Sequence, residues 1–420
     1  MREMKDSGVE WIGDVPATWD LVQTKTVVSC KNEKSDYNGA TYIGLEHIES
    51  GSGKLLTEGK QVDLVVDSTV SSFSASDVLF GKLRPYLAKV AKPDFSGQCS
   101  TEILVLSPSL QIYRNYLFWY MLNPAFIEAV NSSTYGAKMP RANWSFIGSC
   151  IMPLPPLQIQ KDISDFLDKK CAQVDALIAN VQTQIEKLKA YKQSLITEVV
   201  TKGLDPTVPM KDSGVEWIGE IPEHWEITRI KNMFDLRNER NNEADLSKVN
   251  LISLYTDLGV VQHSDITETT GNRAVTAEGY KFVHKDDIVV NIILCWMGAI
   301  GMSKYDGVTS PAYDIYRPLE GTNSEYYHYL FRTNRFNGEC YRYGRGIMMM
   351  RWRTYSTEFR AINIPCPPSS EQKQIVEYLN EKCAQIDRLI AIKQAKIEKL
   401  EQYKRSLIYE YVTGKKEVVC

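Results

Sequence analysis

The decapeptide MKDSGVEWIG stands at residues 4–13 and returns unchanged at residues 210–219. The likeness runs on, because residues 4–20 read MKDSGVEWIGDVPATWD and residues 210–226 read MKDSGVEWIGEIPEHWE. Three bulky or rigid residues recur with it: Trp11, Pro16 and Trp19 return as Trp217, Pro222 and Trp225. A repeat of such long period sets the architecture and has to be resolved first. We interpret the tryptophans and prolines as packing anchors of a segment that the chain uses twice.

A second pair of similar segments begins at residues 153 and 365, where PLPPLQIQKDISDFLDKKCAQVDALIA is matched by PCPPSSEQKQIVEYLNEKCAQIDRLIA. Apolar residues recur there at steps of three and four, which predicts one apolar stripe along a helix. Neither stretch contains Gly or Pro after its Pro-Pro pair, and Gly203 and Gly414 stand where helices end. We therefore expect long helices within segments 153–205 and 365–414, with residues 415–420 as a tail.

Helices of this length need a partner. About 45 residues at 1.5 Å each give roughly 65–70 Å, which exceeds the width of a small domain. A long helix with one narrow apolar stripe buries it against another helix. We predict that the two helices pair as an antiparallel coiled coil, although two separate core helices, each in its own domain, remain an alternative. The seam is imperfect at one level, since Lys393 replaces the counterpart of Val181.

The segments 1–152 and 206–364 share only their first residues but follow the same plan. Each has strand-like text, then an acidic step into an apolar run, an aromatic stretch, and a basic loop containing glycine. The aromatic stretches are Tyr116–Tyr120 and Tyr326–Leu330. Short strands mixed with helical pieces predict two α+β domains. The fold class is therefore α+β, with two such domains alternating with two long helices in an internal, pseudo-twofold duplication.

Composition limits the class of protein. A chain of 420 residues exceeds the usual size of one hydrophobic core. It contains no apolar run long enough for a membrane span, and its first residues lack a secretory pattern. Nine cysteines without a C-x-x-C pair indicate reduced thiols and a cytoplasmic protein. The net charge of −3 means that any surface for nucleic acid must be local.

Two local basic stretches provide candidates for such a surface. Residues 82–144 carry seven Lys or Arg against three acidic residues, and residues 329–360 carry seven Arg against two. Arginine pairs bidentately with guanine edges and with phosphates. The alternative is a solvated face whose aromatic residues are core, and for Met348–Met350 core packing is favoured over contact with thymine methyl groups. The predicted DNA-binding residues are Lys82, Arg84, Lys138, Arg141, Arg342, Arg345, Arg351 and Arg353.

Patterns that carry chemistry are absent from the sequence. Ile48 stands where a phosphate-binding loop ending in Gly53-Lys54 needs its first glycine. No Asn/Asp-Pro-Pro-Tyr/Phe motif occurs, and the five histidines lack metal-site spacing. An acidic pair at Asp94 and Glu102 has Leu104 in place of a nuclease lysine. We predict no catalytic residue, cofactor or metal, so a DNA binder of this kind would lend its specificity to other chains.

The S-G-V-E-W-I-G-[DE]-[VI]-P-x-x-W segment, the P-x-P-P-x-x-x-Q-x-x-I lead into a long helix, and the duplicated layout resemble the specificity subunit of type I restriction–modification systems. The resemblance covers the whole chain. It implies two target-recognition domains, each reading half of a split site in double-stranded DNA, and helices that act as spacer and dock. The implied partners are two adenine-N6 methyltransferase subunits, which use S-adenosylmethionine, and ATP-driven restriction subunits; no membrane is involved.

Because the two domains differ, we predict a non-palindromic target whose central gap goes unread, with helix length fixing the spacing. Arg351→Ala is expected to weaken recognition of one half-site by about 1–3 kcal/mol if this side chain reads a base. Two other functions remain open. One is a stand-alone sequence-specific regulator that binds DNA without a methyltransferase, and the other is a coiled-coil scaffold with no role on DNA.

Overall fold

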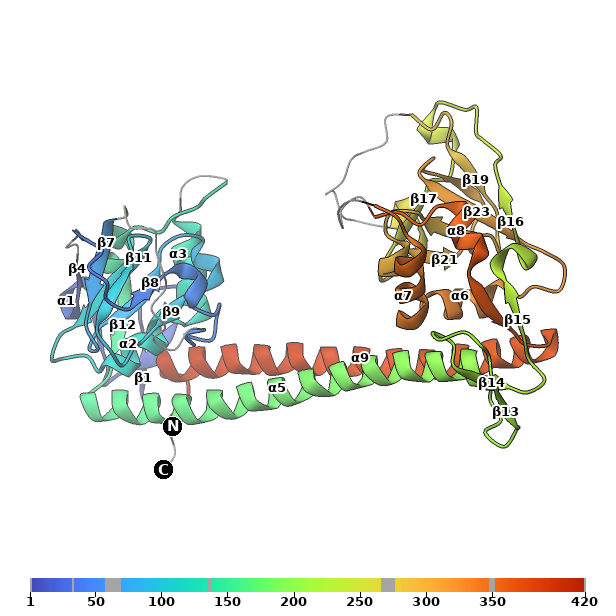
Figure 1. Cartoon of the computed structure of the whole chain (residues 1–420). Coiled ribbons are helices and arrows are strands. Elements are labelled where there is room, and N and C mark those ends of the chain that lie inside the picture. The colour runs from blue at the N-terminus through green and yellow to red at the C-terminus, as the bar shows by residue number, and fades with distance from the viewer. Residues whose placement is uncertain are drawn as a thin grey trace. The chain divides into compact units, whose positions relative to one another are not determined.

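The computed structural model describes residues 2–31, 34–56, 69–134, 138–265, 276–346 and 352–418. These residues form two compact units. Unit 1 consists of residues 1–183 together with 393–420, and unit 2 consists of residues 184–392. Each unit thus combines one α+β domain with one half of each long helix, as the ribbon in Figure 1 shows.

The long helices are α5 (Leu157–Lys202) and α9 (Ser369–Val412), of 46 and 44 residues. They begin after the Pro-Pro pairs because proline N atoms cannot donate, and residues 153–154 and 365–366 of the expected helical segments belong to strands instead. They end at Gly203 (φ 77°) and Gly414 (φ 71°), which take the left-handed backbone that terminates a helix.

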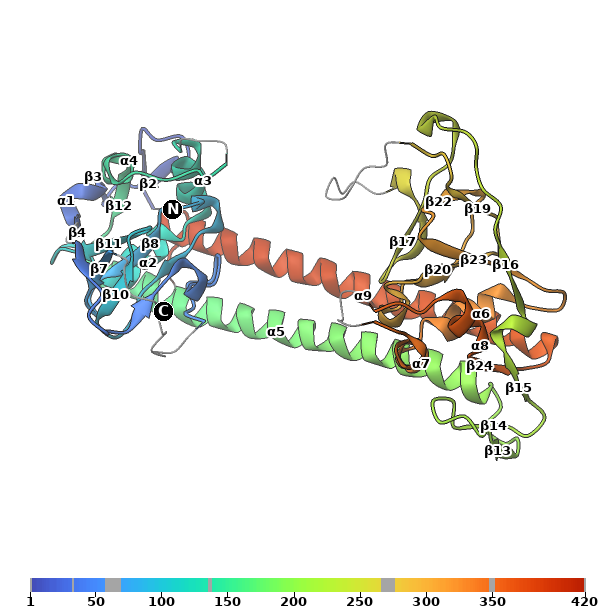
Figure 2. The same ribbon diagram turned by 45° about the horizontal axis from the view of Figure 1, so that its top comes forward.

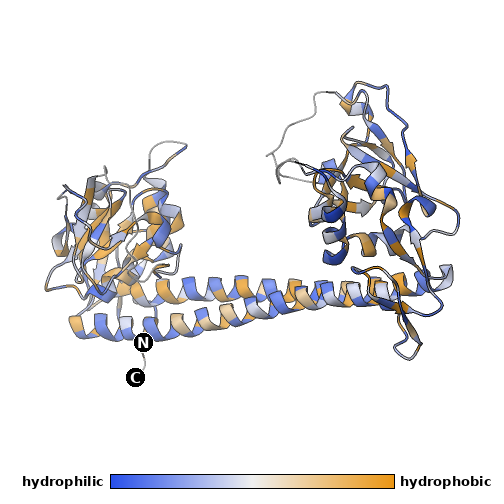
Figure 3. Cartoon of the chain, in the orientation of Figure 1, coloured by the Kyte–Doolittle hydropathy of each residue, from blue (hydrophilic) through white to orange (hydrophobic). Residues whose placement is uncertain are grey.

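The two helices run antiparallel in both units, as predicted. In unit 1 the Lys404 Nζ donates to Asp175 Oδ1 at 2.8 Å, and in unit 2 the Lys192 Nζ donates to Asp387 Oδ1 at 2.7 Å. These are copies of one ion pair, because each Lys and each Asp recurs 212 residues later. Figure 2 gives a second view of the pair, and Figure 3 shows hydrophobic residues alternating with hydrophilic ones along both helices.

Unit 1 is built on two four-stranded sheets, ordered β5-β7-β10-β6 and β4-β11-β8-β9, with the short pairs β1-β2 and β12-β3. Its strands are β1 Met4–Asp6, β2 Asp14–Pro16, β3 Asp20–Gln23, β4 Val28–Lys31, β5 Lys34–Asp36, β6 Tyr42–Ile43, β7 Thr69–Phe73, β8 Val78–Gly81, β9 Val90–Ala91, β10 Gly97–Ser100, β11 Ile103–Pro108 and β12 Ile151–Leu154. Its short helices are α1 Thr24–Val27, α2 Arg114–Met121, α3 Pro124–Ser132 and α4 Trp144–Ser149.

Unit 2 repeats this plan with the sheet β16-β23-β20-β21 and the pairs β13-β14, β15-β24, β17-β18 and β19-β22. Its strands are β13 Met210–Asp212, β14 Glu220–Pro222, β15 Glu226–Arg229, β16 Phe234–Arg237, β17 Ile252–Tyr255, β18 Gly259–Gln262, β19 Lys281–Val283, β20 Ile288–Asn291, β21 Ile300–Met302, β22 Gly307–Thr309, β23 Tyr313–Pro318 and β24 Asn363–Cys366. Its short helices are α6 Ser324–Phe331, α7 Asn334–Tyr343 and α8 Ser356–Ala361.

The central sheets β4-β11-β8-β9 and β16-β23-β20-β21 pair their strands in the same order and register. A buried aspartate at the start of the second central strand pairs with a cation on the edge strand: Asp77 with Lys31 at 2.6 Å, and Asp287 with Arg237 at 3.1 Å. Burial raises the pKa of Asp77, but hydrogen bonds from Lys31, Ser107 and Ser74 outweigh it and hold that pKa below its ordinary value. The shared α+β scaffold predicted for unlike sequences is confirmed.

The repeated decapeptide builds the same hairpin twice. Strand β1 pairs with β2 and β13 pairs with β14 in identical register, with Met4 opposite Pro16 and Met210 opposite Pro222. Each hairpin packs on the end of a long helix. A Cβ added at Gly414 would lie 2.5 Å from Pro16 Cδ, and one added at Gly203 would lie 3.3 Å from Trp225 Cζ2. Each hairpin therefore supports the C-terminus of a long helix. This is the end of α9 in unit 1 and the end of α5 in unit 2.

Each domain core takes in residues from both long helices. In unit 1 the core cluster contains Leu167 of α5 and Val412 of α9, and in unit 2 it contains Val200 of α5 and Leu379 of α9. The predicted aromatic stretches are the buried helices α2 and α6. Their first buried tyrosines fix the helix ends, because Tyr116 Oη donates to Val412 O (3.0 Å) and Tyr326 Oη donates to Val200 O (2.7 Å).

Candidate nucleic-acid interface

In unit 1 the structure brings the predicted residues Lys82, Arg84 and Arg141 together. Two backbone hydrogen bonds join their segments: Arg84 N donates to Pro140 O, and Ala142 N donates to Lys82 O, each at 2.8 Å. Arg84 and Arg141 are exposed, whereas Lys82 is half-buried. Lys138 is exposed two residues before Pro140. The four predicted cations therefore lie on one pair of loops, between β8 and β9 and before α4.

Their electrostatic surroundings differ. Arg141 Nε lies 3.0 Å from Glu102 Oε2, so its charge is partly offset. Burial raises the pKa of the Cys30 thiol, and the positive charge of Lys82 offsets part of that rise. For Arg84 and Lys138 the described part of the chain offers no ion pair. Among the four predicted cations of unit 1, these two are the exposed ones without a described ion-pair partner.

In unit 2 three of the four predicted arginines share one surface. Arg345 and Arg353 form an antiparallel bridge, with Arg345 N donating to Arg353 O at 2.8 Å and the reverse bond at 3.0 Å. Arg342, near the end of α7, is held by Glu339 at 2.7 Å, and Arg345 is held by Glu358 at 2.9 Å. Arg353 is exposed, and the described residues give it no ion-pair partner. Arg351 and Met348–Met350 lie outside the described residues.

Aromatic side chains support this surface: Tyr341 and Trp352 are interleaved with the basic stretch in the sequence, whereas Trp296 comes from outside it. Trp352 stacks on Tyr341 with ring centroids 4.8 Å apart, and the ring of Trp296 meets that of Tyr341 edge-on at 5.6 Å. Trp352 Nε1 also donates to Tyr341 O at 2.9 Å. These ring contacts join the end of α7 and Trp352, which precedes Arg353, to η6 (Cys295–Met297). The contact is between segments distant in the chain, so local sequence patterns could not predict it.

Several charges counted in the basic stretches have a structural role instead. The guanidinium of Arg332 donates to the backbone carbonyls of Thr256, Asp257, Gly298 and Ile300 at 2.7–3.3 Å, and burial lowers its pKa. In unit 1, Arg114 donates to Asp77 O and Pro93 O. These two arginines tie loops together, so the basic surface of each unit is smaller than the residue count indicates.

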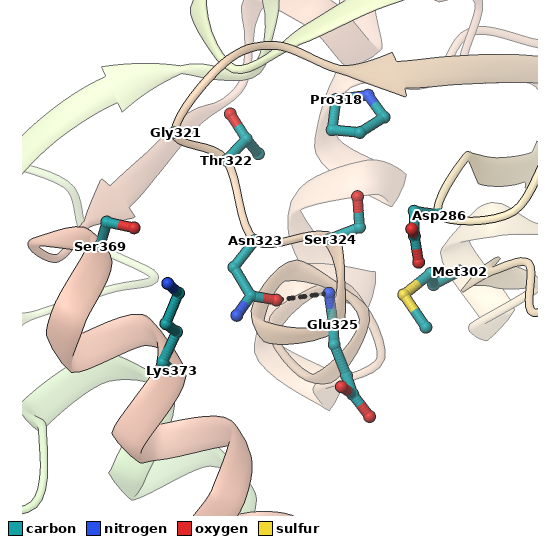
Figure 4. A pocket seen from close by; sticks show the side chains of 10 residues that line it. All are labelled: Asp286, Met302, Pro318, Gly321, Thr322, Asn323, Ser324, Glu325, Ser369 and Lys373. Carbon is teal, nitrogen blue, oxygen red and sulfur yellow. Dashed lines mark hydrogen bonds between the residues drawn. The ribbon is translucent and has the colours of Figure 1, made fainter.

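A cavity of about 420 Å³ lies in unit 2 between the starts of α6 and α9 and the turn at Asp286 (Figure 4). The residues that line it are Asp286, Met302, Pro318, Gly321, Thr322, Asn323, Ser324, Glu325, Ser369 and Lys373. Asn323 Oδ1 accepts a hydrogen bond from Glu325 N at 3.0 Å. Ser324, the first residue of α6, takes the place that Arg114 has at the start of α2. We attribute the cavity to this exchange, because the serine side chain is much shorter than the arginine side chain of unit 1.

Groups able to do chemistry are not gathered in the described residues. These residues contain no cluster of three or more His, Cys, Asp or Glu side chains that could hold a metal ion. Burial lowers the pKa of His328 to about 3, and its Nδ1 accepts a hydrogen bond from Met302 N, so this imidazole is a packing group. None of the helices that the structure describes combines the length and hydrophobicity of a membrane span.

Two α+β domains on a shared scaffold, alternating with paired long helices, define a class of internally duplicated proteins. The family comparison agrees: residues 19–189 and 222–402 both match the type I restriction modification DNA specificity domain. The chain belongs to this family.

Two curated relatives match nearly the whole chain, and a third matches part of it. The specificity subunit of the type I restriction enzyme MjaVIII from Methanocaldococcus jannaschii is 24% identical over 96% of this chain and 93% of its own length. The putative MjaX specificity subunit of the same organism is also 24% identical, over 96% of this chain and 95% of its own length. The EcoBI specificity subunit of Escherichia coli is 26% identical over 42% of this chain and 44% of its own.

Solved structures share the fold. One, described as the structural basis of complex assembly and conformational transition of the type I R-M system, matches with a TM-score of 0.71 at 16% identity and covers 95% of this chain and 98% of that chain. The HsdS subunit of Thermoanaerobacter tengcongensis matches with a TM-score of 0.53 at 17% identity, covering 96% and 98%.

Proposed function

We propose that this chain is the DNA-binding specificity subunit of a type I restriction–modification complex. Each domain reads one half of a bipartite, non-palindromic site in double-stranded DNA, and the paired helices set the unread gap. Methyl transfer to adenine N6 and ATP-dependent cleavage belong to partner subunits. The observation that carries the proposal is a constant scaffold with unlike exposed loops: the Ala142–Lys82 backbone bond recurs as Thr354–Ile292, yet the side chains around it differ.

Two unlike readers on one chain increase specificity because the second contact becomes intramolecular once the first has formed. Arg84 and Lys138 in unit 1 and Arg353 in unit 2 are the proposed contacts to DNA, together with Arg141, Arg342 and Arg345 after exchange of their carboxylate partners for phosphates. Lys82, which is half-buried in the same loop as Arg84, is retained as a proposed contact. Arg351 is retained as a proposed base-reading residue from its place in the sequence.

The test is to co-express the chain with a methyltransferase encoded beside it and to map methylated adenines by single-molecule sequencing. A split motif with a fixed gap and unlike halves is expected. Arg84→Ala and Arg353→Ala should each relax a different half, by about 1–3 kcal/mol for a base contact. A palindromic or unbroken motif would contradict the proposal that the two domains recognise unlike halves of a split site. Tight, specific DNA binding with no dependence on a methyltransferase would favour a stand-alone regulator, and no DNA binding would favour a scaffold.

The long helices offer a docking surface for the methyltransferase subunits in each unit. Cys171, Val174 and Val181 of α5 lie buried in the helix pair, whereas Leu177 on its flank is 49% exposed. The Asp175–Lys404 contact sets Tyr403 of α9, 51% exposed, at the same level. In an antiparallel pair the two flanking positions meet on one side, so Leu177 and Tyr403 form an exposed apolar pair.

The same pair recurs in unit 2 with the helices exchanged. Leu389 of α9 is 47% exposed and Tyr191 of α5 is 57% exposed, and the Lys192–Asp387 contact sets them at one level. Two copies of one apolar surface suit two copies of one partner, which supports the proposed stoichiometry of two methyltransferase subunits.

The docking proposal can be tested one surface at a time. Replacing Leu177 and Tyr403 with Glu is expected to leave one methyltransferase per chain in the purified complex, and the Tyr191/Leu389 double variant should do the same. A matched control is Gln173→Glu, an exposed position on the same helix. Mass photometry gives the stoichiometry. Two methyltransferases retained by both double variants would exclude these surfaces as the dock.

A further inference from the structure

The loop that follows β8 in unit 1 and β20 in unit 2 is held in the same way in both units. We call residues 82–88 and 292–298 the reading loops. Gly81 N donates to Lys89 O at 2.8 Å, and Asn291 N donates to Ala299 O at 3.0 Å, so each loop begins and ends on equivalent strand residues. Each contains one short 3-10 turn, η2 (Pro85–Leu87) and η6 (Cys295–Met297). Positions therefore correspond one to one, and Leu294 stands where unit 1 has Arg84.

This exchange alters the chemistry presented by the loop. Unit 1 presents the guanidinium of Arg84 beside Tyr86, whereas unit 2 presents Leu294 and Met297, which are 38% and 51% exposed. The backbone of Arg84 is left-handed, with a φ of 52°, a conformation that side-chain-bearing residues seldom adopt. Such conformations concentrate at functional positions, because the surrounding structure has to hold them in place.

The reading loop of unit 2 is joined through its backbone to the basic surface described above. Thr354 N donates to Ile292 O at 2.9 Å, which ties the reading loop directly to the strand of Arg353. Arg345 pairs with that strand from the other side. Isolated apolar side chains framed by guanidinium groups match the major groove of DNA, where phosphates flank the base edges and thymine presents a methyl group.

The loop of unit 2 is also rigid enough to act as a reader. Asn291, only 8% exposed, accepts hydrogen bonds from Ile293 N and Leu294 N through its Oδ1, at 3.0 and 3.3 Å. Trp296 Nε1 donates to Ile293 O at 2.9 Å, and its ring meets Tyr341. A preorganised apolar group loses little conformational freedom when a base covers it. The difference in affinity between one base and another then depends on the contact itself.

We propose that Leu294 and Met297 read a thymine methyl group, so that unit 2 recognises an A·T pair at the position where Arg84 of unit 1 recognises a G·C pair. The inference rests on the proposed function and adds what each reading loop selects. Guanine offers two acceptors, N7 and O6, to an arginine fork, whereas thymine offers a methyl group that a leucine can cover. The two half-sites should therefore differ in base composition at equivalent steps.

The experiment uses the full chain with its co-purified subunits and a duplex carrying the mapped motif, followed by fluorescence anisotropy. Each thymine of the motif is replaced in turn with uracil, which removes only the 5-methyl group. One replacement, in one half-site, is expected to weaken binding about fourfold, the value of one buried methyl group. Leu294→Ala should weaken binding to the thymine duplex and should abolish the difference between thymine and uracil at that position alone.

Arg84→Ala is the matched control, because it leaves the uracil effect intact while removing the sensitivity of the other half-site to 7-deazaguanine, which lacks the N7 acceptor. A uracil effect that persists undiminished in Leu294→Ala would overturn the inference, as would a unit 2 half-site that contains no thymine or responds to none of the replacements. Either result would contradict only the inference about Leu294, because the bipartite motif would remain. Absence of a bipartite motif would instead count against the proposed function.

Discussion

The packing of each hairpin on a helix end can be tested with a graded series of glycine substitutions. Gly8, Gly203 and Gly414 all have φ values of 70–77°, so Ala at any of them takes on left-handed backbone strain of about 1 kcal/mol. They differ in what the new methyl group meets. At Gly8 nothing lies within 4 Å of the added Cβ, at Gly203 the nearest atom is Trp225 Cζ2 at 3.3 Å, and at Gly414 it is Pro16 Cδ at 2.5 Å.

The expected cost follows from these distances. A Cβ 2.5 Å from a proline ring, with Trp19 Cη2 at 2.9 Å behind it, cannot be accommodated without moving the hairpin. Overpacking of this kind costs typically 1–3 kcal/mol, which with the backbone strain gives about 3 kcal/mol for Gly414→Ala. At Gly203 a shift of a few tenths of an ångström suffices, so the total should be about 1–2 kcal/mol. Gly8→Ala should cost about 1 kcal/mol.

Hydrogen–deuterium exchange read by mass spectrometry reports the local effect, because the free energy of opening is measured peptide by peptide. Gly414→Ala should accelerate exchange in residues 9–19, and Gly203→Ala should do so, more weakly, in residues 215–225. Urea unfolding gives the global value. If Gly414→Ala proved no more destabilising than Gly8→Ala, the contact of the hairpin with the end of α9 would be refuted.

Three further outcomes can be measured. Asp77→Asn should destabilise unit 1 by about 1–3 kcal/mol in urea, because Lys31, Ser74 and Ser107 lose a charged hydrogen-bond acceptor. Because the pKa of Asp77 is lowered in the folded chain, its carboxylate stabilises the fold at neutral pH, and this stabilisation is lost as the pH falls from the unfolded value of about 3.8 through the folded pKa. The variant should therefore flatten the acid limb of a thermal-shift profile. Arg332→Ala should cost about 2–4 kcal/mol by leaving carbonyls unpaired, yet methylome mapping should show an unchanged motif. A fragment of residues 184–392 should melt cooperatively by calorimetry, whereas residues 1–183 should need residues 393–418 added in trans; cooperative melting of 1–183 alone would contradict this.

Much of the architecture could be predicted from the sequence, because the chain contains two copies of its main segments that can be compared with each other. The duplicated decapeptide and helical segments located both hairpins and both long helices, and the single apolar stripe on each helix indicated the antiparallel pairing. Local pattern could not show that each domain core takes residues from both helices. That arrangement depends on contacts such as Tyr116 to Val412, separated by 296 residues.

The candidate site was only partly predictable, for a physical reason. A count of charges does not distinguish one arginine from another. Whether a guanidinium is used inside the fold or left exposed depends on the carbonyl groups within hydrogen-bonding distance. Arg332 hydrogen-bonds to loop carbonyls, whereas Arg353 is exposed, although both belong to the same basic stretch. The correspondence of Arg84 with Leu294 was equally hidden, because the two middle segments have diverged too far to align and only their shared hydrogen bonds give the register.

The two units are equivalent in contacts but not in how the chain closes them. Unit 2 is one continuous segment, and its hairpin follows the end of α5 after the short stretch between Gly203 and Met210. In unit 1 the hairpin and its helix end come from opposite ends of the sequence, held by hydrogen bonds from Arg2 to Gly414 O and from Lys415 to Asp14 O. Closing a loop of about 400 residues in place of one of about 10 costs roughly 3 kcal/mol more by the logarithmic law. Unit 1 should therefore have the lower stability margin, even though both units pack a helix end on a hairpin of nearly the same sequence and of the same register.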